Sequence, residues 1–201
     1  MRRWWVSPRH RDAPVGAGWT RPRSRLTTAR DRGPSEKGAS VATSQWHKLY
    51  TADVAAPPER LFQLLSDMPH YGDWLPGSGS FGATTDVEPY PVQLGSRYHD
   101  GKPDRPGRDW WGSVIGFRPP GSIDFHHVIS VRQVRATVDV HIHYSFEADG
   151  GTTRVGRWLV LDIAMPMIFR PLRPFITSSF DRENLRTMAA VTAYAEAHPG
   201  A

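Results

Sequence analysis

The chain of 201 residues contains no cysteine and no long apolar run. The absence of cysteine excludes disulfide bonds and thiolate chemistry, and it suits a reducing compartment, so we expect a cytoplasmic protein. No stretch approaches the roughly 20 uninterrupted apolar residues of a membrane-spanning helix. The most apolar window, residues 159–176, is interrupted by Asp162, Arg170, Arg173 and three prolines. We therefore expect no integral association with a membrane.

Outside its first 42 residues, the chain also lacks an excess of basic residues. The whole chain has a net charge of +5, but residues 1–42 contain ten basic and three acidic residues and so account for +7. The remaining residues hold 15 basic and 17 acidic side chains, a net charge of −2. Because this larger part carries no basic stripe, we expect it not to bind nucleic acid.

Residues 1–42 are rich in Arg, Pro, Gly and Ser and lack aliphatic periodicity, a composition typical of disorder. They also lack the apolar segment of about 7–15 residues found in a secretory signal. One interpretation is an arginine- and tryptophan-rich arm that contacts anionic lipid or RNA. The other, which we favour, is a start codon placed too far upstream, with translation beginning near Val41. We predict a disordered or spurious leader over residues 1–42 and one folded domain over residues 43–201.

From Trp46 onwards the chain has the pattern of an α+β domain. Alternating residues over 46–54 predict a strand, and the leucine-rich run over 55–67 predicts a short helix with prolines in its first turn. Six strand-like runs separated by Gly/Pro turns follow, at residues 80–87, 94–101, 109–117, 122–130, 133–148 and 152–163. A final helix is predicted over about 168–197.

The final helix has an apolar stripe, in which residues recur at every fourth position. Its members are Leu172, Ile176, Phe180, Asn184 and Met188, widened by Leu185, Val191 and Ala195. The strand over 133–148 alternates apolar and polar residues, which indicates an antiparallel strand with one solvated side. Together these patterns predict a curved antiparallel sheet of about seven strands that wraps around the long C-terminal helix.

Three phrases in this order resemble a known family: APPERLFQLLSDMPHYGDWLPG at 56–77, LGSRYHDG at 94–101, and RPLRPFITSSFDRENLRTMAAVTAYAE at 170–196. The chain resembles the START-like, or SRPBCC, superfamily, and within it the polyketide cyclase/dehydrase and lipid-transport group. The resemblance covers residues 46–197. It implies a helix-grip fold with a hydrophobic cavity between the sheet and the last helix, but no single chemistry, because members bind, carry, cyclise or regulate.

In such a fold the candidate ligand-contacting residues lie on inward strand faces, on the last helix and in the segment after the first helix. They are Trp74, Tyr98, Trp110, Phe125, His127, Tyr144, Arg157 and Phe175. Trp74 either lines the cavity mouth together with Tyr71 or packs as ordinary core. His127 is either an acid or base or a neutral, hydrogen-bonded residue of the wall. If its face is inward, Arg157 is a cation for a ligand carboxylate or enolate. Asn184 either donates to a ligand carbonyl or holds a buried water.

His141 and His143 lie on one strand face and are half of a possible metal site. Their face is the polar one, however, and no carboxylate-rich phrase accompanies them, so we predict no metal and no cofactor. The oligomeric state stays open.

We expect a protein that binds a hydrophobic small molecule, namely a lipid, a fatty acyl group or a polyketide-like compound. One alternative is a polyketide cyclase or dehydratase in which His127, Tyr98 or Arg157 positions an enolisable carbonyl. This alternative needs at least two titratable groups aimed at one point inside the cavity. A second alternative is a non-catalytic interaction module whose cavity is filled by its own large side chains.

Overall fold

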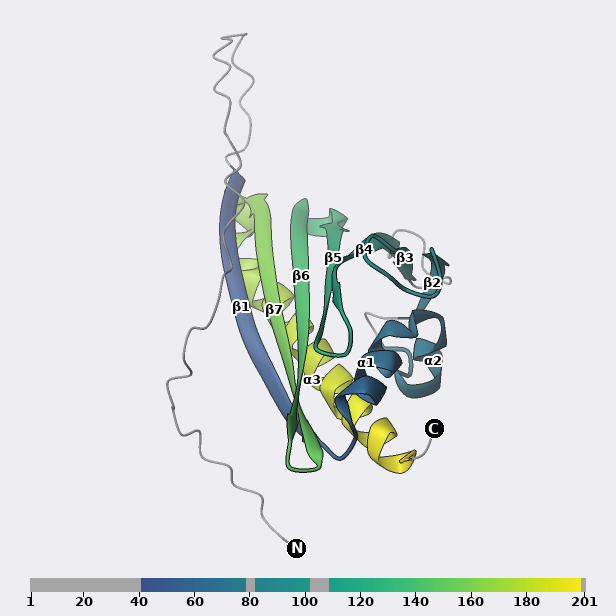
Figure 1. Cartoon of the computed structure of the whole chain (residues 1–201). Coiled ribbons are helices and arrows are strands. Elements are labelled where there is room, and N and C mark those ends of the chain that lie inside the picture. Colours follow the sequence, from purple (N-terminus) through teal and green to yellow (C-terminus); the bar gives the residue numbers. More distant parts are fainter. Residues whose placement is uncertain (1–40, 79–81, 102–108, 200–201) are drawn as a thin grey trace, which may run out of the picture. The chain divides into compact units, whose positions relative to one another are not determined.

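The computed structural model describes residues 41–78, 82–101 and 109–199, which form one antiparallel sheet and a long C-terminal helix (Figure 1). The strands are β1 (Val41–Val54), β2 (Ala83–Glu88), β3 (Arg97–Gly101), β4 (Asp109–Arg118), β5 (Ser122–Val131), β6 (Ala136–Asp149) and β7 (Thr152–Pro166). The helices are α1 (Pro58–Ser66), α2 (Tyr71–Trp74) and α3 (Arg173–Ala197), with 3-10 turns η1 (Met68–His70), η2 (Arg132–Val134) and η3 (Met167–Leu172).

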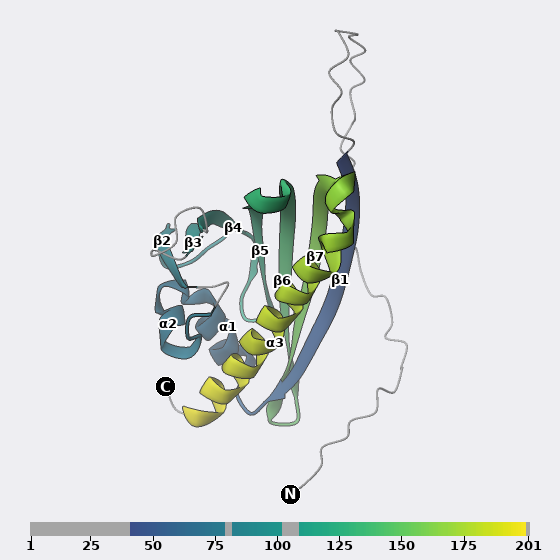
Figure 2. The ribbon, with the colours of Figure 1, turned by 180° about the vertical axis from the view of Figure 1, so that it is seen from behind.

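The seven strands are ordered β1-β7-β6-β5-β4-β3-β2, and each pairs with its neighbour in antiparallel register. Seen from behind, α3 runs across one face of the sheet, over β6 and β7 (Figure 2). The α+β architecture predicted from the sequence is therefore confirmed. No helix of the described ranges is long and apolar enough to cross a membrane.

Strand boundaries differ from the predicted ones where the backbone turns. The strand predicted from residue 133 begins only at Ala136, because residues 132–134 form a 3-10 turn and Arg135 has a left-handed φ of 48°. The strand predicted from residue 94 begins at Arg97, because Gly95 has a φ of 87°. The predicted leader lies outside the described residues except for Val41 and Ala42, which begin β1. Of the run predicted over 80–87, residues 80 and 81 also lie outside them.

The apolar stripe of α3 is narrower than predicted. Asn184, Met188, Val191 and Ala195 are buried, and Ile176 and Phe180 are half-buried against the core. Leu185 is 52% exposed, so its assignment to the stripe is wrong. Each residue of an α-helix is turned by about 100° from the one before, and the burial of Asn184 directs Leu185 away from the sheet. Leu172, also assigned to the stripe, lies in η3 before the helix begins and is 38% exposed.

Polar contacts hold α3 against the edge strand β1. Lys48 Nζ and the Tyr50 hydroxyl both donate to Asp181 Oδ1, at 2.6 and 2.8 Å, and Arg173 Nη2 donates to the Gln45 carbonyl oxygen at 2.6 Å. Pairs that are this exposed add little to stability. Their consequence is geometric, since they fix the distance of the helix from one edge of the sheet.

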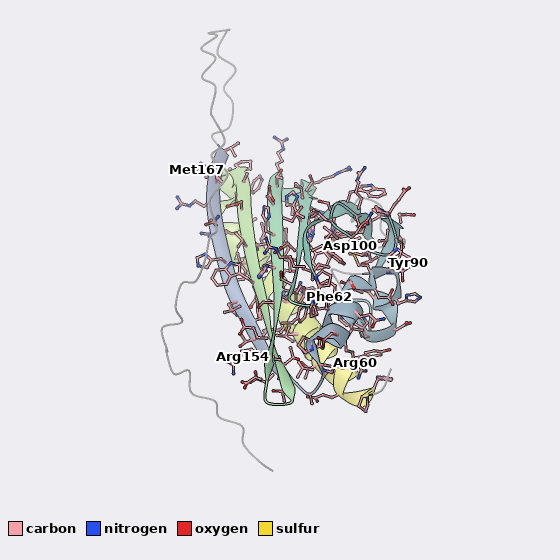
Figure 3. All side chains as sticks on the ribbon, in the orientation of Figure 1. Arg60, Phe62, Tyr90, Asp100, Arg154 and Met167 are labelled. Carbon is pink, nitrogen blue, oxygen red and sulfur yellow. The ribbon has the colours of Figure 1, made fainter. Side chains whose placement is uncertain are left out.

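Aromatic packing fills one end of the space between sheet and helices. Phe62 of α1 meets Phe117 and Phe146 edge-on, at ring-centroid distances of 5.1 and 6.1 Å. Figure 3 shows Phe62 near this end, and Arg154 and Met167 at opposite ends of β7. The space further along β7 is not filled in this way, and the candidate site lies there.

Candidate functional site

A cavity of about 820 Å³ lies between α3 and the inward face of the sheet. Pockets that take small ligands commonly have volumes of about 300–1,000 Å³. All eight residues selected from the sequence line this cavity: Trp74, Tyr98, Trp110, Phe125, His127, Tyr144, Arg157 and Phe175. The structure therefore brings the candidate residues together around one space, whereas their contact with a ligand stays a prediction.

The cavity opens at the end of the sheet where α3 begins. Phe175, in the first turn of α3, is 73% exposed and stands at the rim. Val128, Ser130 and Arg132, which also line the cavity, are exposed and lie at the η2 end of β5. Figures 1 and 2 show η2 and the start of α3 at the same end of the sheet.

Trp74 is part of the wall and not of the mouth. It is 5% exposed, and its ring meets the Tyr71 ring edge-on at 4.9 Å. The Tyr71 hydroxyl donates to the Leu65 carbonyl oxygen at 2.6 Å, which fixes the segment after α1. Trp74 thus packs in the core, as the second alternative from the sequence expects, and it also lines the cavity wall.

Tyr98 and His127 form a polar pair in the wall. The Tyr98 hydroxyl lies 3.3 Å from His127 Nδ1, and Trp110 stacks on the imidazole at a centroid distance of 6.1 Å. Burial lowers the pKa of His127 to about 3 and raises that of Tyr98 well above its ordinary value. A neutral imidazole that accepts the Tyr98 proton at Nδ1 leaves its Nε2–H as a donor. Gly112 on β4 makes room for this pair, because a Cβ there would collide with the Tyr98 ring.

Asp100 is a titratable group of the wall that the sequence reasoning missed. It belongs to β3, is labelled in Figure 3 and lines the cavity. Burial raises its pKa to about 6, although the hydrogen bond from Thr84 Oγ1 to Asp100 Oδ1, at 2.5 Å, opposes the shift. A signal was present, since residues two apart on a strand share a face and Asp100 follows Tyr98 by two.

Arg157 is a buried cation in the wall. Alternation along β7 places it on the inward face together with Val155 and Leu159, whereas Trp158 faces outward. Its guanidinium carbon lies 4.8 Å from the centre of the Tyr144 ring. Burial lowers the Arg157 pKa to about 10, so the side chain is still charged at neutral pH. Among the described residues no carboxylate lies within ion-pair distance of it.

Asn184 holds Arg157 in place. Arg157 Nε donates to Asn184 Oδ1 at 2.5 Å, and Asn184 Nδ2 donates to the Phe180 carbonyl oxygen at 2.7 Å. Both polar ends of the Asn184 amide are therefore engaged within the protein. These two bonds give Asn184 a positioning role that joins α3 to β7, and its role as a donor to a ligand carbonyl through the second N–H of Nδ2 stays a prediction.

Comparison with solved structures finds the same fold. An uncharacterised protein from Rhizobium leguminosarum matches 78% of this chain and 98% of its own length, with a TM-score of 0.59 and 12% identity. Norcoclaurine synthase from Thalictrum flavum, in complex with dopamine and hydroxybenzaldehyde, matches 89% and 100%, with a TM-score of 0.56 and 14% identity. The di-domain ARO/CYC BexL from the BE-7585A biosynthetic pathway matches 77% of this chain and 51% of its own, with a TM-score of 0.58 and 15% identity.

These identities are low, so the likeness concerns the fold and not the chemistry. No protein-family model matches the chain, and no curated protein matches it in sequence.

The burial of His127 predicts a measurable pH dependence. The pKa of His127 is 6.5 in the unfolded chain and about 3 in the folded protein. Between pH 6.5 and pH 3, only the unfolded chain therefore takes up a proton at this residue. The unfolded state then binds more protons, so acidification destabilises the fold. Relative to His127→Gln, the free energy of unfolding of the wild type should fall by roughly 2 kcal/mol between pH 7 and pH 5. Urea unfolding followed by tryptophan fluorescence measures this difference.

Asp100 changes the free energy of unfolding with pH in the opposite direction. Because its pKa is raised in the folded protein, its contribution to stability falls as pH rises from about 4 to 6. It is present in both proteins and cancels in the comparison. His47→Gln, which removes an exposed imidazole outside the cavity, serves as the control for loss of a histidine. A wild-type minus His127→Gln difference that is constant from pH 7 to pH 5 would show that His127 takes up its proton in the folded state.

Proposed function

The chain has the helix-grip fold of the START-like, or SRPBCC, superfamily, and we propose that it binds a hydrophobic small molecule that carries an anionic or carbonyl group. The molecule would be a lipid, a fatty acyl compound or a polyketide-like compound, held in the cavity between α3 and the sheet. The bound dopamine and hydroxybenzaldehyde of the norcoclaurine synthase structure support a small-molecule ligand for this fold. The proposal invokes no cofactor and no nucleic acid, and a cytoplasmic location stays a prediction from the absence of cysteine.

The observation that supports this proposal best is the burial of the Arg157 cation without an ion pair among the described residues. A buried cation is costly unless an anion or several acceptors surround it. Within the protein, the Arg157 guanidinium contacts one amide oxygen, from Asn184, and one aromatic ring, from Tyr144. Nε donates the hydrogen bond to Asn184, and no hydrogen bond from the other two nitrogens is found among the described residues. A ligand carboxylate or carbonyl in the cavity would supply the missing acceptors for the other two nitrogens.

Apolar walls would hold the rest of the ligand. Phe125, Tyr144, Val140 and Leu159 line the cavity and are almost completely buried. Burial of apolar surface contributes about 25 cal/mol per Å², so a ligand with a modest hydrocarbon body gains several kcal/mol from this contact. The volume of about 820 Å³ also argues against the interaction module with a filled interior.

The cyclase or dehydratase alternative is favoured by one observation, the convergence of Tyr98, His127, Asp100 and Arg157 on the same cavity. Proton transfer is most efficient when the pKa of the base lies near the working pH. His127, with a pKa of about 3, is therefore a poor base, and Asp100, with a pKa of about 6, is better matched. An enzyme built on this cavity would use Asp100 as the base and Arg157 to polarise the carbonyl.

Replacing Arg157 tests the binding proposal. Arg157→Leu should weaken a fatty acid more than its methyl ester, by roughly 1–3 kcal/mol, because the acid loses a charge-assisted hydrogen bond. Titration calorimetry of the acid and the ester against both proteins gives the two affinity losses. Arg154→Leu is a matched control three residues earlier on β7, where the side chain is exposed and pairs with Asp53 at 3.1 Å.

Arg154→Leu should leave both affinities unchanged. Equal losses for acid and ester in Arg157→Leu would remove Arg157 from the head-group role but leave the cavity as the binding site. If the folded wild type takes up neither the acid nor the ester, the binding proposal is wrong.

Isotope exchange separates the binding protein from the enzyme. A β-ketoacyl thioester that occupies the cavity in D₂O should exchange its α-protons no faster than it does in buffer, because the binding proposal requires no base. NMR of the thioester measures the rate. Fast exchange by the wild type that is lost in Asp100→Asn, with affinity retained, would favour the cyclase or dehydratase instead.

A further inference from the structure

On the outer face of the sheet, opposite the cavity, β5 and β6 bring two histidines and one aspartate together. We propose that His126, Asp139 and His141 bind a divalent ion of the zinc type. Their ligand atoms all lie within 4.8 Å of one another. This site is independent of the cavity and of the function proposed for it.

The strand register creates the cluster. His126 and His141 are directly opposite each other in the β5–β6 ladder, and Asp139 precedes His141 by two residues, so all three side chains share one face. Asp139 Oδ1 lies 2.8 Å from His126 Nε2 and 3.2 Å from His141 Nε2, and the two imidazole rings are stacked with centroids 4.5 Å apart. Both Nε2 atoms thus approach the same carboxylate oxygen.

These distances are close to those of a metal site. Two ligand atoms at about 2.1 Å from a tetrahedral zinc ion are roughly 3.4 Å apart. The three side chains are 30–43% exposed, so small torsion changes can open the cluster by the few tenths of an ångström that an ion requires. Three protein ligands on an exposed face leave a further coordination position to water.

A second observation concerns the charge beside the cluster. Asp162 of β7 is directly opposite Asp139 in the β6–β7 register. Like charges in this position destabilise a sheet. Gln45 Nε2 donates to Asp162 Oδ1 at 3.0 Å, but it brings no positive charge. A cation held by the cluster would compensate the two carboxylates.

The donor set indicates which ions fit. Imidazole and carboxylate together suit Zn²⁺, Ni²⁺ and Cu²⁺, whereas Mg²⁺ and Ca²⁺ prefer oxygen ligands alone. The sequence pointed to His141 and His143 as the pair and found no carboxylate partner. In the structure His143 contacts Asp124 instead, at 2.5 Å, and the true neighbours of His141 come from β5 and from Asp139.

Zinc titration of the full chain, without an affinity tag, tests this site. We expect the wild type to bind one Zn²⁺ at the cluster, with no response to Mg²⁺. Loss of an outer-shell partner of a metal ligand lowers metal affinity by about 10- to 100-fold. Asp139→Asn and His141→Asn each remove a direct ligand and should lower the zinc affinity by at least this factor. His143→Asn is the matched control, on the same strand and face, and should bind zinc as the wild type does. Calorimetry measures these affinities.

Substitution of Co²⁺ gives a second readout, because its visible absorption reports direct coordination and should disappear in His126→Gln. Circular dichroism identifies any variant that fails to fold, and the remaining variants then decide the question. Zinc affinity that is equal in the wild type and in all folded cluster variants would overturn the proposal. So would equal losses in His143→Asn and His141→Asn, or the absence of binding by the wild type.

Discussion

The contact between Arg157 and Asn184 joins the two layers of the fold at the point where they do not pack directly. Arg157 belongs to β7 and Asn184 to α3, and the hydrogen bond between them spans one side of the cavity. The second hydrogen bond of Asn184, to the Phe180 carbonyl oxygen, ties the amide to its own helix. Removal of either partner would leave a buried polar group unsatisfied, which costs more than the bond itself contributes.

The rest of the structure keeps the space around this contact open. At one end, the aromatic rings of Phe62, Phe117 and Phe146 fill the interior. Along one edge, Lys48 and Tyr50 hold α3 through Asp181. Between these two groups of contacts, the wall is lined by side chains that face the cavity. The same arrangement explains why Arg157 is both buried and short of acceptors.

Much of this could be predicted from the sequence. Alternation along β7 and β6 offered the inward face for Arg157 and Tyr144, and the order of elements predicted the antiparallel sheet and the long helix. The patterns that succeeded are those in which a residue's direction depends only on its own strand or helix. Leu185 was misplaced because a stripe of small and polar residues such as Asn184 is only weakly defined by hydrophobicity.

Contacts that depend on the register between strands were not predictable in the same way. The meeting of His126 with His141, and of Asp139 with Asp162, follows from which residues face each other across two ladders. A shift of one residue in a ladder would change every partner across that ladder. Asp100 was within reach of sequence reasoning, but its pKa of about 6 depends on burial by neighbouring strands. The space that lets Tyr98 reach His127 likewise depends on Gly112, which lies opposite Tyr98 on β4.

The central claim is that the cavity holds an apolar molecule whose polar group meets Arg157. Native mass spectrometry of the protein purified from the organism that makes it tests this most directly. We expect an additional mass that dissociates on activation and belongs to an apolar compound with a carboxylate or carbonyl group. A folded protein that shows only the mass of its own chain, and that takes up no added fluorescent fatty acid, would contradict the account.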